Sequence, residues 1–302
     1  MGKRDRTAVG AVVSTGRTFN GIAALCLALA LVAGVTAAIG VFDRGSGETA
    51  SAVSIRGERF DYATDGIYAF NPERVVAEGV GWDVVTLLFA VPALLLALPA
   101  LRRGSLGGRL FTVGILAYFF YQYMMYAMFW ALGPLFPVFI VLYAAAACAI
   151  VWIVSTIDVE GLPARFSAGF PRKGMAVFSV LVALMLLVMW SQRIATGLSG
   201  DLAGAALFGM PTLTVQAMDL GMVVPLAIAT AVLLFRSKPW GYLLAPVFAV
   251  KGVTMAGAIC AMLVSAALVE GSLEVVPFVM FAAVALASGA LAWRILRSAR
   301  TV

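Results

Sequence analysis

Long apolar runs separated by short polar segments dominate the chain. Each run is long enough to cross about 30 Å of hydrocarbon as a helix that rises about 1.5 Å per residue. Only residues 43–80 form a sizeable polar interruption. The pattern predicts an all-α, polytopic transmembrane helix bundle of about eight spans. The predicted spans are 20–42, 82–101, 110–132, 134–157, 174–191, 213–235, 240–268 and 274–296.

The polar segments predict how the chain is organised around these spans. Residues 1–19 are basic and polar and predict a cytoplasmic tail, so that 20–302 form one bundle. Within 43–80, turn signals separate short alternating pieces, which predicts a small hairpin-like extracytoplasmic insert. We expect 192–211 to form a loop with a partial re-entrant piece, because this segment is too polar and Gly-rich to span.

A helix start is predicted at the end of the insert. Asn71 has the position of an N-cap, Pro72 that of the first helical residue, and Glu73 supplies an acid to the first turn. Because the following residues are still polar, we expect this helix to lie at the membrane interface, ahead of the second span.

Lysine and arginine fall unevenly between the two sides of the predicted bundle. With the N-terminus in the cytoplasm, 15 of the 21 lysines and arginines lie on the cytoplasmic side, against three of the 15 acids. The positive-inside rule is thus obeyed, and the formal charge of +6 needs no nucleic-acid partner to explain it. We expect a multi-pass protein of the plasma membrane with both termini in the cytoplasm.

Composition excludes several classes of protein. With 63% hydrophobic residues, 12% charged residues and a mean hydropathy of +1.01, the chain has too few polar groups for a soluble surface. Its three cysteines stand alone, and it has no histidine, the commonest zinc and haem ligand. The sequence therefore predicts no metal site and no cofactor. The excess of arginine over lysine, in an Ala/Val/Leu/Gly-rich chain, is typical of a GC-rich bacterial genome.

The most unusual polar residues are Asp219 and Lys251, which lie inside the sixth and seventh spans. The two spans are joined by a tight basic turn at 236–239. Counting about 1.5 Å per residue from this turn places Lys251 near the mid-plane and Asp219 about 7 to 8 Å further along, within reach of a lysine stem. An isolated charge at a helix centre costs about 2.5–3.5 kcal/mol, so we expect both to face the bundle interior and each other.

The neighbours of these two residues support an inward-facing polar site. Gln216 shares a helical side with Asp219, and Thr254 shares one with Lys251. Two interpretations stay open: the site binds or transports a ligand, or the pair is a structural staple that fixes the register of the helices.

A polar aromatic stripe runs along the third span. Tyr118, Gln122 and Tyr126 recur at helical spacing, and Gln122 lies near the height of Lys251. The stripe could line a ligand cavity or a water path. Hydrogen-bonded packing between helices is the favoured interpretation. Other charges at the predicted outer ends of spans are interpreted as solvated anchors: Glu78, Asp83, Arg193, Asp201, Glu270 and Glu274.

Two stretches of the chain resemble each other. WDVVTLLFAVPALLLALPALRRG in the second span and MDLGMVVPLAIATAVLLFRSKPWG in the sixth each have an acid near the start, a proline and a basic end with glycine. Four spans in each half would then form parallel repeats related about the membrane normal.

The run D-L-G-x-x-x-P at 219–225, followed by L-L-x-R-x-x-P-W-G-Y-x-L and the buried lysine, resembles a recurring pattern in uncharacterised bacterial multi-spanning membrane proteins. G-x-D-x-V-T-L at 81–87, R-G-S-L at 103–106 and the Tyr-rich third span extend the resemblance over much of 66–258. The segment GIYAFNPE departs from that pattern. The resemblance implies a fold of about eight helices and brings no activity with it.

Three functions compete on this basis. The leading hypothesis is a small transporter, channel-like or ligand-binding membrane protein that takes a small polar or ionic ligand at Asp219 and Lys251. The alternative is a non-catalytic accessory or scaffold protein that binds a partner through 43–80. An enzyme is less favoured, because histidine is absent and no nucleophile stands beside a base. A retinal-type Schiff base on Lys251 is disfavoured by the eight spans.

Overall fold

The computed structural model describes the backbone of residues 4–299 and the side chains of 16–299. Eight helical segments in this part of the chain are long and apolar enough to cross a membrane. The prediction of an all-α bundle of eight spans is therefore confirmed. The spans are Gly16–Phe42, Glu73–Arg102, Leu106–Phe129, Phe136–Ser155, Arg172–Leu198, Thr214–Phe235, Pro239–Glu270 and Val275–Ser298.

Ten α-helices, two π-helical turns and one 3₁₀ turn build the described chain, with a single two-stranded sheet. The first half contains α1 (Arg4–Phe42), β1 (Thr49–Val53), β2 (Arg59–Ala63), α2 (Glu73–Val85), η1 (Thr86–Ala90), α3 (Val91–Arg102), α4 (Leu106–Phe129) and α5 (Phe136–Ser155). After η2 (Leu162–Arg165), the second half contains α6 (Arg172–Leu198), α7 (Thr214–Met218), η3 (Asp219–Val223), α8 (Val224–Phe235), α9 (Pro239–Glu270) and α10 (Val275–Ser298).

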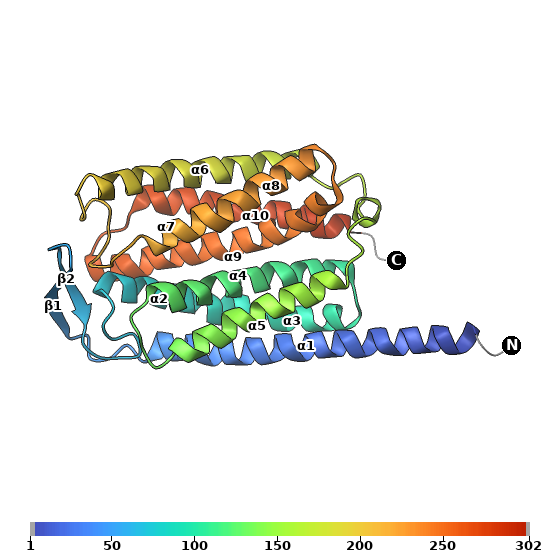
Figure 1. Cartoon of the computed structure of the whole chain (residues 1–302), viewed down its shortest axis with the longest axis horizontal. Coiled ribbons are helices and arrows are strands. Elements are labelled where there is room, and N and C mark those ends of the chain that lie inside the picture. The colour runs from blue at the N-terminus through green and yellow to red at the C-terminus, as the bar shows by residue number, and fades with distance from the viewer. Residues whose placement is uncertain (1–3, 300–302) are drawn as a thin grey trace.

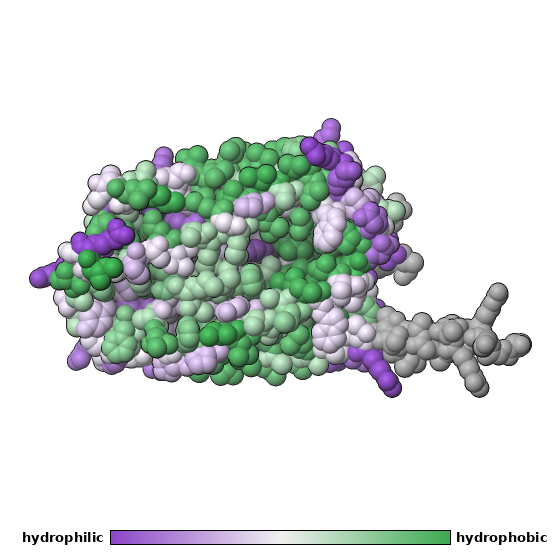
Figure 2. Space-filling view, viewed as in Figure 1, coloured by the Kyte–Doolittle hydropathy of each residue, from purple (hydrophilic) through white to green (hydrophobic). Residues whose placement is uncertain are grey.

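The helices lie side by side along one direction (Figure 1). The β1–β2 hairpin marks one end of the bundle, called here the hairpin end. α1 begins and α10 finishes toward the opposite end, called here the terminal end. Hydrophobic residues cover the middle of the molecule, and hydrophilic residues gather at both ends (Figure 2). This distribution is that of an integral membrane protein whose apolar belt contacts lipid.

The hairpin forms as predicted, but the polar insert is shorter than expected. β1 and β2 pair antiparallel, with Ser51 opposite Asp61. The predicted helix start is confirmed, since α2 begins at Glu73, and the helix runs without interruption into the second span. That its first turns lie at the membrane interface stays a prediction. Asn71 does not cap this helix: its side chain accepts a hydrogen bond from the Ala131 backbone N–H at 2.8 Å and joins the insert to the segment after α4.

Two other predicted segments also differ. α1 begins at Arg4, so 4–19 of the predicted tail continue the first span as helix, while 1–3 lie outside the described residues. α6 continues to Leu198, and the turns that follow up to 213 contain no re-entrant helix. Pro134 lies in a short loop between α4 and α5, as the sequence predicts.

The chain repeats one structural unit. The π-helical turns η1 and η3 are followed by α3 and α8, each 12 residues long, and then by α4 and α9. The corresponding first residues are offset by 133 positions (86 to 219, 91 to 224, and 106 to 239). The predicted repetition of the second and sixth spans is confirmed. The offset of 133, however, aligns Thr86 with Asp219 and Asp83 with Gln216, so the two acids do not correspond.

The two copies share their backbone details. Val91 N–H donates to the carbonyl of Thr86, and Val224 N–H donates to that of Asp219, the bond of a π-turn. Pro92 or Pro225, neither of which can donate a backbone hydrogen bond, follows directly. The widened turn therefore lies where the helical hydrogen-bond pattern is broken.

The basic turns of the two copies match as well. Gly104 and Ser237 both have positive φ, 67° and 55°. Close helix packing follows at Gly108 and Gly241: an added Cβ would lie 2.8 Å from the Cβ of Ala100 in the first copy and 2.9 Å from the carbonyl carbon of Leu233 in the second. Glycine at these positions lets the two helices of each hairpin approach.

The halves pack in the same way internally. α1 packs on α3 as α6 packs on α8, and α5 packs on α4 as α10 packs on α9. The halves meet where α2 and α4 pack on α9 (Figure 1). Their interiors differ. In the first half, Tyr118, Tyr123 and Tyr126 are fully buried and fill the core. The second half borders a cavity, which α2 and α4 of the first half also line.

Candidate functional site

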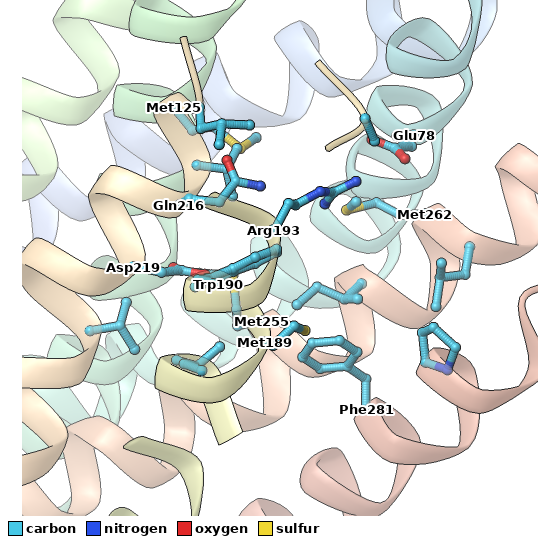
Figure 3. A pocket seen from close by; sticks show the side chains of 18 of the residues that line it. Glu78, Met125, Met189, Trp190, Arg193, Gln216, Asp219, Met255, Met262 and Phe281 are labelled. Atoms are coloured by element: carbon cyan, nitrogen blue, oxygen red, sulfur yellow. The ribbon is translucent and has the colours of Figure 1, made fainter. Parts of the chain in front are cut away.

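A cavity of about 710 Å³ lies between the second half of the bundle and the helices of the first half that face it. Residues of α2, α4, α6, α7, η3, α9 and α10 line it, together with the loop 203–208. Its size is that of a small-molecule site. Figure 3 shows Asp219 and Trp190 on one wall, with Met189, Met255 and Phe281 beside them. The walls are thus mainly apolar, with a few polar groups.

Asp219 is held by two donors from other helices. Its Oδ1 accepts from the hydroxyl of Tyr121 on α4 at 2.6 Å, and its Oδ2 accepts from Nε1 of Trp190 on α6 at 2.8 Å. Because Asp219 is the first residue of η3, the π-turn places this carboxyl group where the helix is widened. The carboxyl group therefore joins three spans at one point of the cavity wall.

Lys251 contacts the ring of the same tyrosine, Tyr121. Its Nζ stands 4.4 Å from the centroid of the Tyr121 ring, a cation–π contact, and its side chain is 8% exposed. The predicted direct pair is wrong: Asp219 and Lys251, both in the described chain, form no ion pair within 4.0 Å. Tyr121 of α4, a helix that packs against α9, contacts both instead: its hydroxyl donates to Asp219, and its ring face lies beside the Lys251 ammonium.

Near Lys251, Ser288 of α10 also faces the cavity. Its Oγ is fully buried and has no hydrogen-bond partner in the described chain. The hydroxyl packs against α9, since a Cβ added to Gly252 would lie 2.4 Å from it. A buried hydroxyl without a partner is unfavourable unless something binds it. The polar groups at this end of the cavity thus include two without a hydrogen-bond partner.

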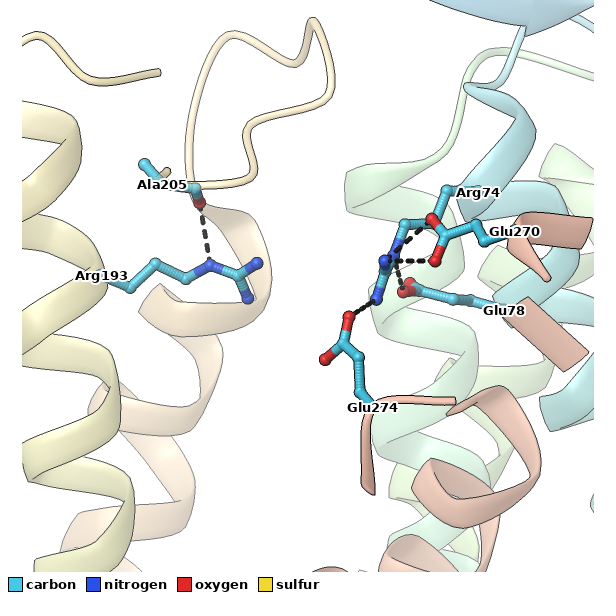
Figure 4. Close-up of polar contacts among 6 residues, drawn as sticks. All are labelled: Arg74, Glu78, Arg193, Ala205, Glu270 and Glu274. Atoms are coloured by element: carbon cyan, nitrogen blue, oxygen red, sulfur yellow. Dashed lines mark hydrogen bonds and ion pairs between the residues drawn. The ribbon is translucent and has the colours of Figure 1, made fainter. Parts of the chain in front are cut away.

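A charged cluster stands at the hairpin end of the cavity (Figure 4). Arg74 of α2 pairs with Glu78 at 3.0 Å, with Glu270 of α9 at 2.8 Å and with Glu274 beside α10 at 2.5 Å. The predicted solvated anchors Glu78, Glu270 and Glu274 therefore form one network that joins three spans. Arg193 uses its Nε to donate to the carbonyl of Ala205 at 2.8 Å and extends its guanidinium across the cavity toward Glu78 (Figure 3).

The loop 203–209 lines the cavity at this end. The ring of Phe208 lies 5.5 Å from the guanidinium carbon of Arg74, and the N–H of Gly209 donates to Glu58 of the hairpin insert at 2.9 Å. Ala206 and Phe208 both have positive φ, which is unusual for residues with a Cβ. The hairpin insert is thus hydrogen-bonded to a loop of the cavity wall.

The residues of the predicted stripe on the third span have two different surroundings: two pack between helices, and one lines the cavity. Tyr118 and Gln122 each contact the hydroxyl of Thr86 at 2.8 Å, fully buried and away from the cavity. Tyr126 lines the cavity and donates to the carbonyl of Gly79. Gln216 also lines it, whereas the Thr254 hydroxyl donates to the carbonyl of Lys251 and lies outside the lining.

Asp83 is a second buried carboxyl group, in the first half. It is fully buried rather than solvated as predicted, because the second span starts earlier than expected and carries it inside. Its Oδ2 accepts from the hydroxyl of Tyr68 at 2.5 Å. Burial first, and then the charge of Asp83, raises the pKa of Tyr68 well above its usual value, so this phenol keeps its proton and stays a donor.

Sequence reasoning missed Tyr121, Trp190 and Ser288. Tyr121 lies three residues after Tyr118, in a run with tyrosine on several faces, and the rings of both stack on Trp82. No pattern in the sequence shows which of those faces meets Asp219. Trp190 resembles an interfacial tryptophan, and Ser288 is one small polar residue in an alanine-rich span.

The described residues contain no group of three or more Asp, Glu, Cys or His side chains that could hold a metal ion. No protein-family model matches the chain, and neither the curated proteins nor the solved structures give a match.

Proposed function

We propose that this membrane protein binds a small solute in the cavity and moves it across the bilayer, as a transporter or channel-like protein. Asp219 and Lys251 form the polar part of the site. The observation that carries the proposal is the position of these two groups on the wall of a cavity of about 710 Å³ inside a transmembrane bundle. Ionisable groups that face a cavity at membrane depth are costly to place there and commonly serve a solute or proton path.

The internal repeat favours this proposal over a structural staple. In the first half, Thr86 and Tyr118 occupy the positions of Asp219 and Lys251, and their hydroxyls hydrogen-bond at 2.8 Å. The equivalent pair of helices in the first half therefore packs with neutral groups at both positions. Because packing alone does not need the charges, Asp219 and Lys251 serve another purpose in the second half.

Reconstitution into liposomes tests the proposal. We expect Asp219→Asn and Lys251→Met to reduce solute-dependent proton or ion flux by about tenfold or more, since each change removes one of the two ionisable groups that form the proposed site on the cavity wall. Thermal unfolding of the detergent-purified variants, with and without candidate solutes, is measured alongside the flux.

Two substitutions of exposed charged residues serve as matched controls. Asp43→Asn and Lys238→Met remove the same charges outside the cavity and are expected to leave flux unchanged. Wild-type flux and solute-dependent melting in Asp219→Asn and Lys251→Met, with only a change in stability, would restore the structural interpretation of the pair.

The orientation in the membrane is part of the proposal: the terminal end faces the cytoplasm. Support comes from the arginines and lysines of the 102–109, 158–173 and 236–238 connections, with far fewer acids. We expect a cysteine placed at Ser237 to be protected from a membrane-impermeant maleimide in intact cells, and one placed at Ser54 in the hairpin to be labelled. Labelling in the reverse sense would invert the assignment.

A further inference from the structure

We propose that the ligand of the cavity is an organic monocarboxylate with an apolar body, bound through its carboxylate by Lys251 and Ser288. This inference rests on the proposed function and names the class of solute. It starts from which polar groups on the cavity wall already have partners and which do not.

The carboxyl groups of the wall already accept hydrogen bonds. Both oxygens of Asp219 accept, from Tyr121 and from Trp190. Glu78 and Glu274 both accept from Arg74. A cationic ligand would have to compete with these donors, and Lys251 would repel it. The carboxyl groups on the wall therefore do not point to an amine as the ligand.

Two donors at the Lys251 end of the wall, by contrast, have no hydrogen-bond partner in the described chain. Lys251 lines the cavity, is more than nine-tenths buried, and makes no hydrogen bond or ion pair within the described residues. Its one close contact, the Tyr121 ring, leaves all three N–H groups available. The buried Oγ of Ser288 has no partner either. Two unpartnered donors on adjacent helices, α9 and α10, require acceptors that the ligand supplies.

A single negative charge fits this site best. One ammonium and one hydroxyl match the two oxygens of a carboxylate, whereas a phosphate commonly takes arginine forks or several backbone N–H groups. The carboxyl group of Asp219, hydrogen-bonded to the hydroxyl of Tyr121, also disfavours a second negative charge. Arg193, near the hairpin end, faces Glu78 and is partly balanced by it (Figure 3).

The remaining walls accommodate an apolar body. Met189, Met255, Met262 and Phe281 line the cavity together. Methionine side chains are flexible and polarizable, so they adapt to aliphatic or aromatic bodies of different shape. The ligand is thus an amphipathic acid with its carboxylate at Lys251 and its hydrocarbon among these side chains.

Three probes with the same body and different head groups test the inference. We would titrate 3-phenylpropionate, 3-phenylpropylamine and 3-phenylpropanol into the full-length protein in lipid nanodiscs, with octanoate as a second acid, and measure binding by calorimetry and thermal shift. We expect the acids to bind and the amine and alcohol to bind at least about tenfold more weakly.

The variants separate a site from simple partitioning into lipid. Lys251→Met should weaken acid binding about tenfold to a hundredfold, Ser288→Ala about threefold to tenfold, and Lys251→Arg should retain most of it. Gly257→Ala, on the same helix with open space around it, is the control for folding and should bind as wild type does.

Tighter binding of the amine, failure of both acids to bind, or equal binding of the acids to wild type and Lys251→Met would each overturn the inference. The proposed function would survive any of these results if flux of another solute still depended on Asp219 and Lys251. Both would fail if no flux depended on those two residues.

Discussion

Gly81→Val is expected to abolish the folded bundle, and Gly81→Ala to lower its stability severely. A Cβ at Gly81 would lie 2.5 Å from the carbonyl oxygen of Ala261 and 2.7 Å from the backbone nitrogen of Met262. These atoms belong to the backbone of α9, so no side chain can rotate away. Overpacking ordinarily costs about 1–3 kcal/mol, and a backbone clash between two long helices belongs at or above the upper end of that range.

Gly257→Ala is the matched control for this substitution. Gly257 lies on α9 about one turn before Ala261, and an added Cβ there would meet nothing within 4 Å. Alanine in an open helical position stabilises by about 0.5–1 kcal/mol relative to glycine. In detergent, the melting temperature should therefore fall for Gly81→Ala and rise for Gly257→Ala, and size-exclusion profiles should show loss of the folded species only for Gly81→Ala. A Gly81→Ala protein that melts like wild type would show that α2 and α9 are not packed this closely.

Arg74→Met is expected to destabilise the hairpin end of the bundle strongly. The substitution keeps an apolar stem but leaves Glu78, Glu270 and Glu274 without their shared cation. Breaking a fully buried ion pair from one side costs about 3–5 kcal/mol. Because the side chains of Glu270 and Glu274 are 35% and 46% exposed, water screens part of the repulsion and the loss should fall below that range.

Charge repulsion predicts that a second substitution rescues part of this loss. Adding Glu274→Gln to Arg74→Met should recover part of the stability, because it removes one of the three acids left without their cation. Arg56→Met, which removes an exposed arginine of the hairpin insert, should leave the melting temperature unchanged. A deficit that Glu274→Gln does not reduce would point to lost packing of the arginine stem instead.

The spans could be predicted because lipid imposes a simple rule: a side chain that faces hydrocarbon must be apolar. That rule fails where polar groups satisfy one another between helices. Arg74 and Glu78 made the start of the second span look like a surface segment, and their ion pairs with α9 and the start of α10 are visible only after folding. The interior position of Asp83 was missed for the same reason.

The sequence was enough to single out the charged residues of the site, but not the residues that contact them. Asp219 and Lys251 stand out because an isolated charge in an apolar run is unfavourable. Their relation depends on Tyr121, and the run YFFYQYMMY places tyrosines on several faces of α4. Which face meets α9 is decided by the packing of the two halves, which brings Gly114 of α4 against Val250 of α9. Hydropathy carries no information about that choice.

The constant offset between the halves also changes how the connection between them can be viewed. Each half packs internally as the other does, and the two meet along α2, α4 and α9, so their contact has the form of a subunit interface within a pseudodimer. The segment from Thr156 to Pro171, which contains η2, is then a tether. It sets a high effective concentration of one four-span unit for the other and makes their association independent of protein concentration. A covalent tether also ensures that each half with a tyrosine-filled core is joined to one half that carries Asp219 and Lys251, a pairing that two free copies of one unit could not enforce.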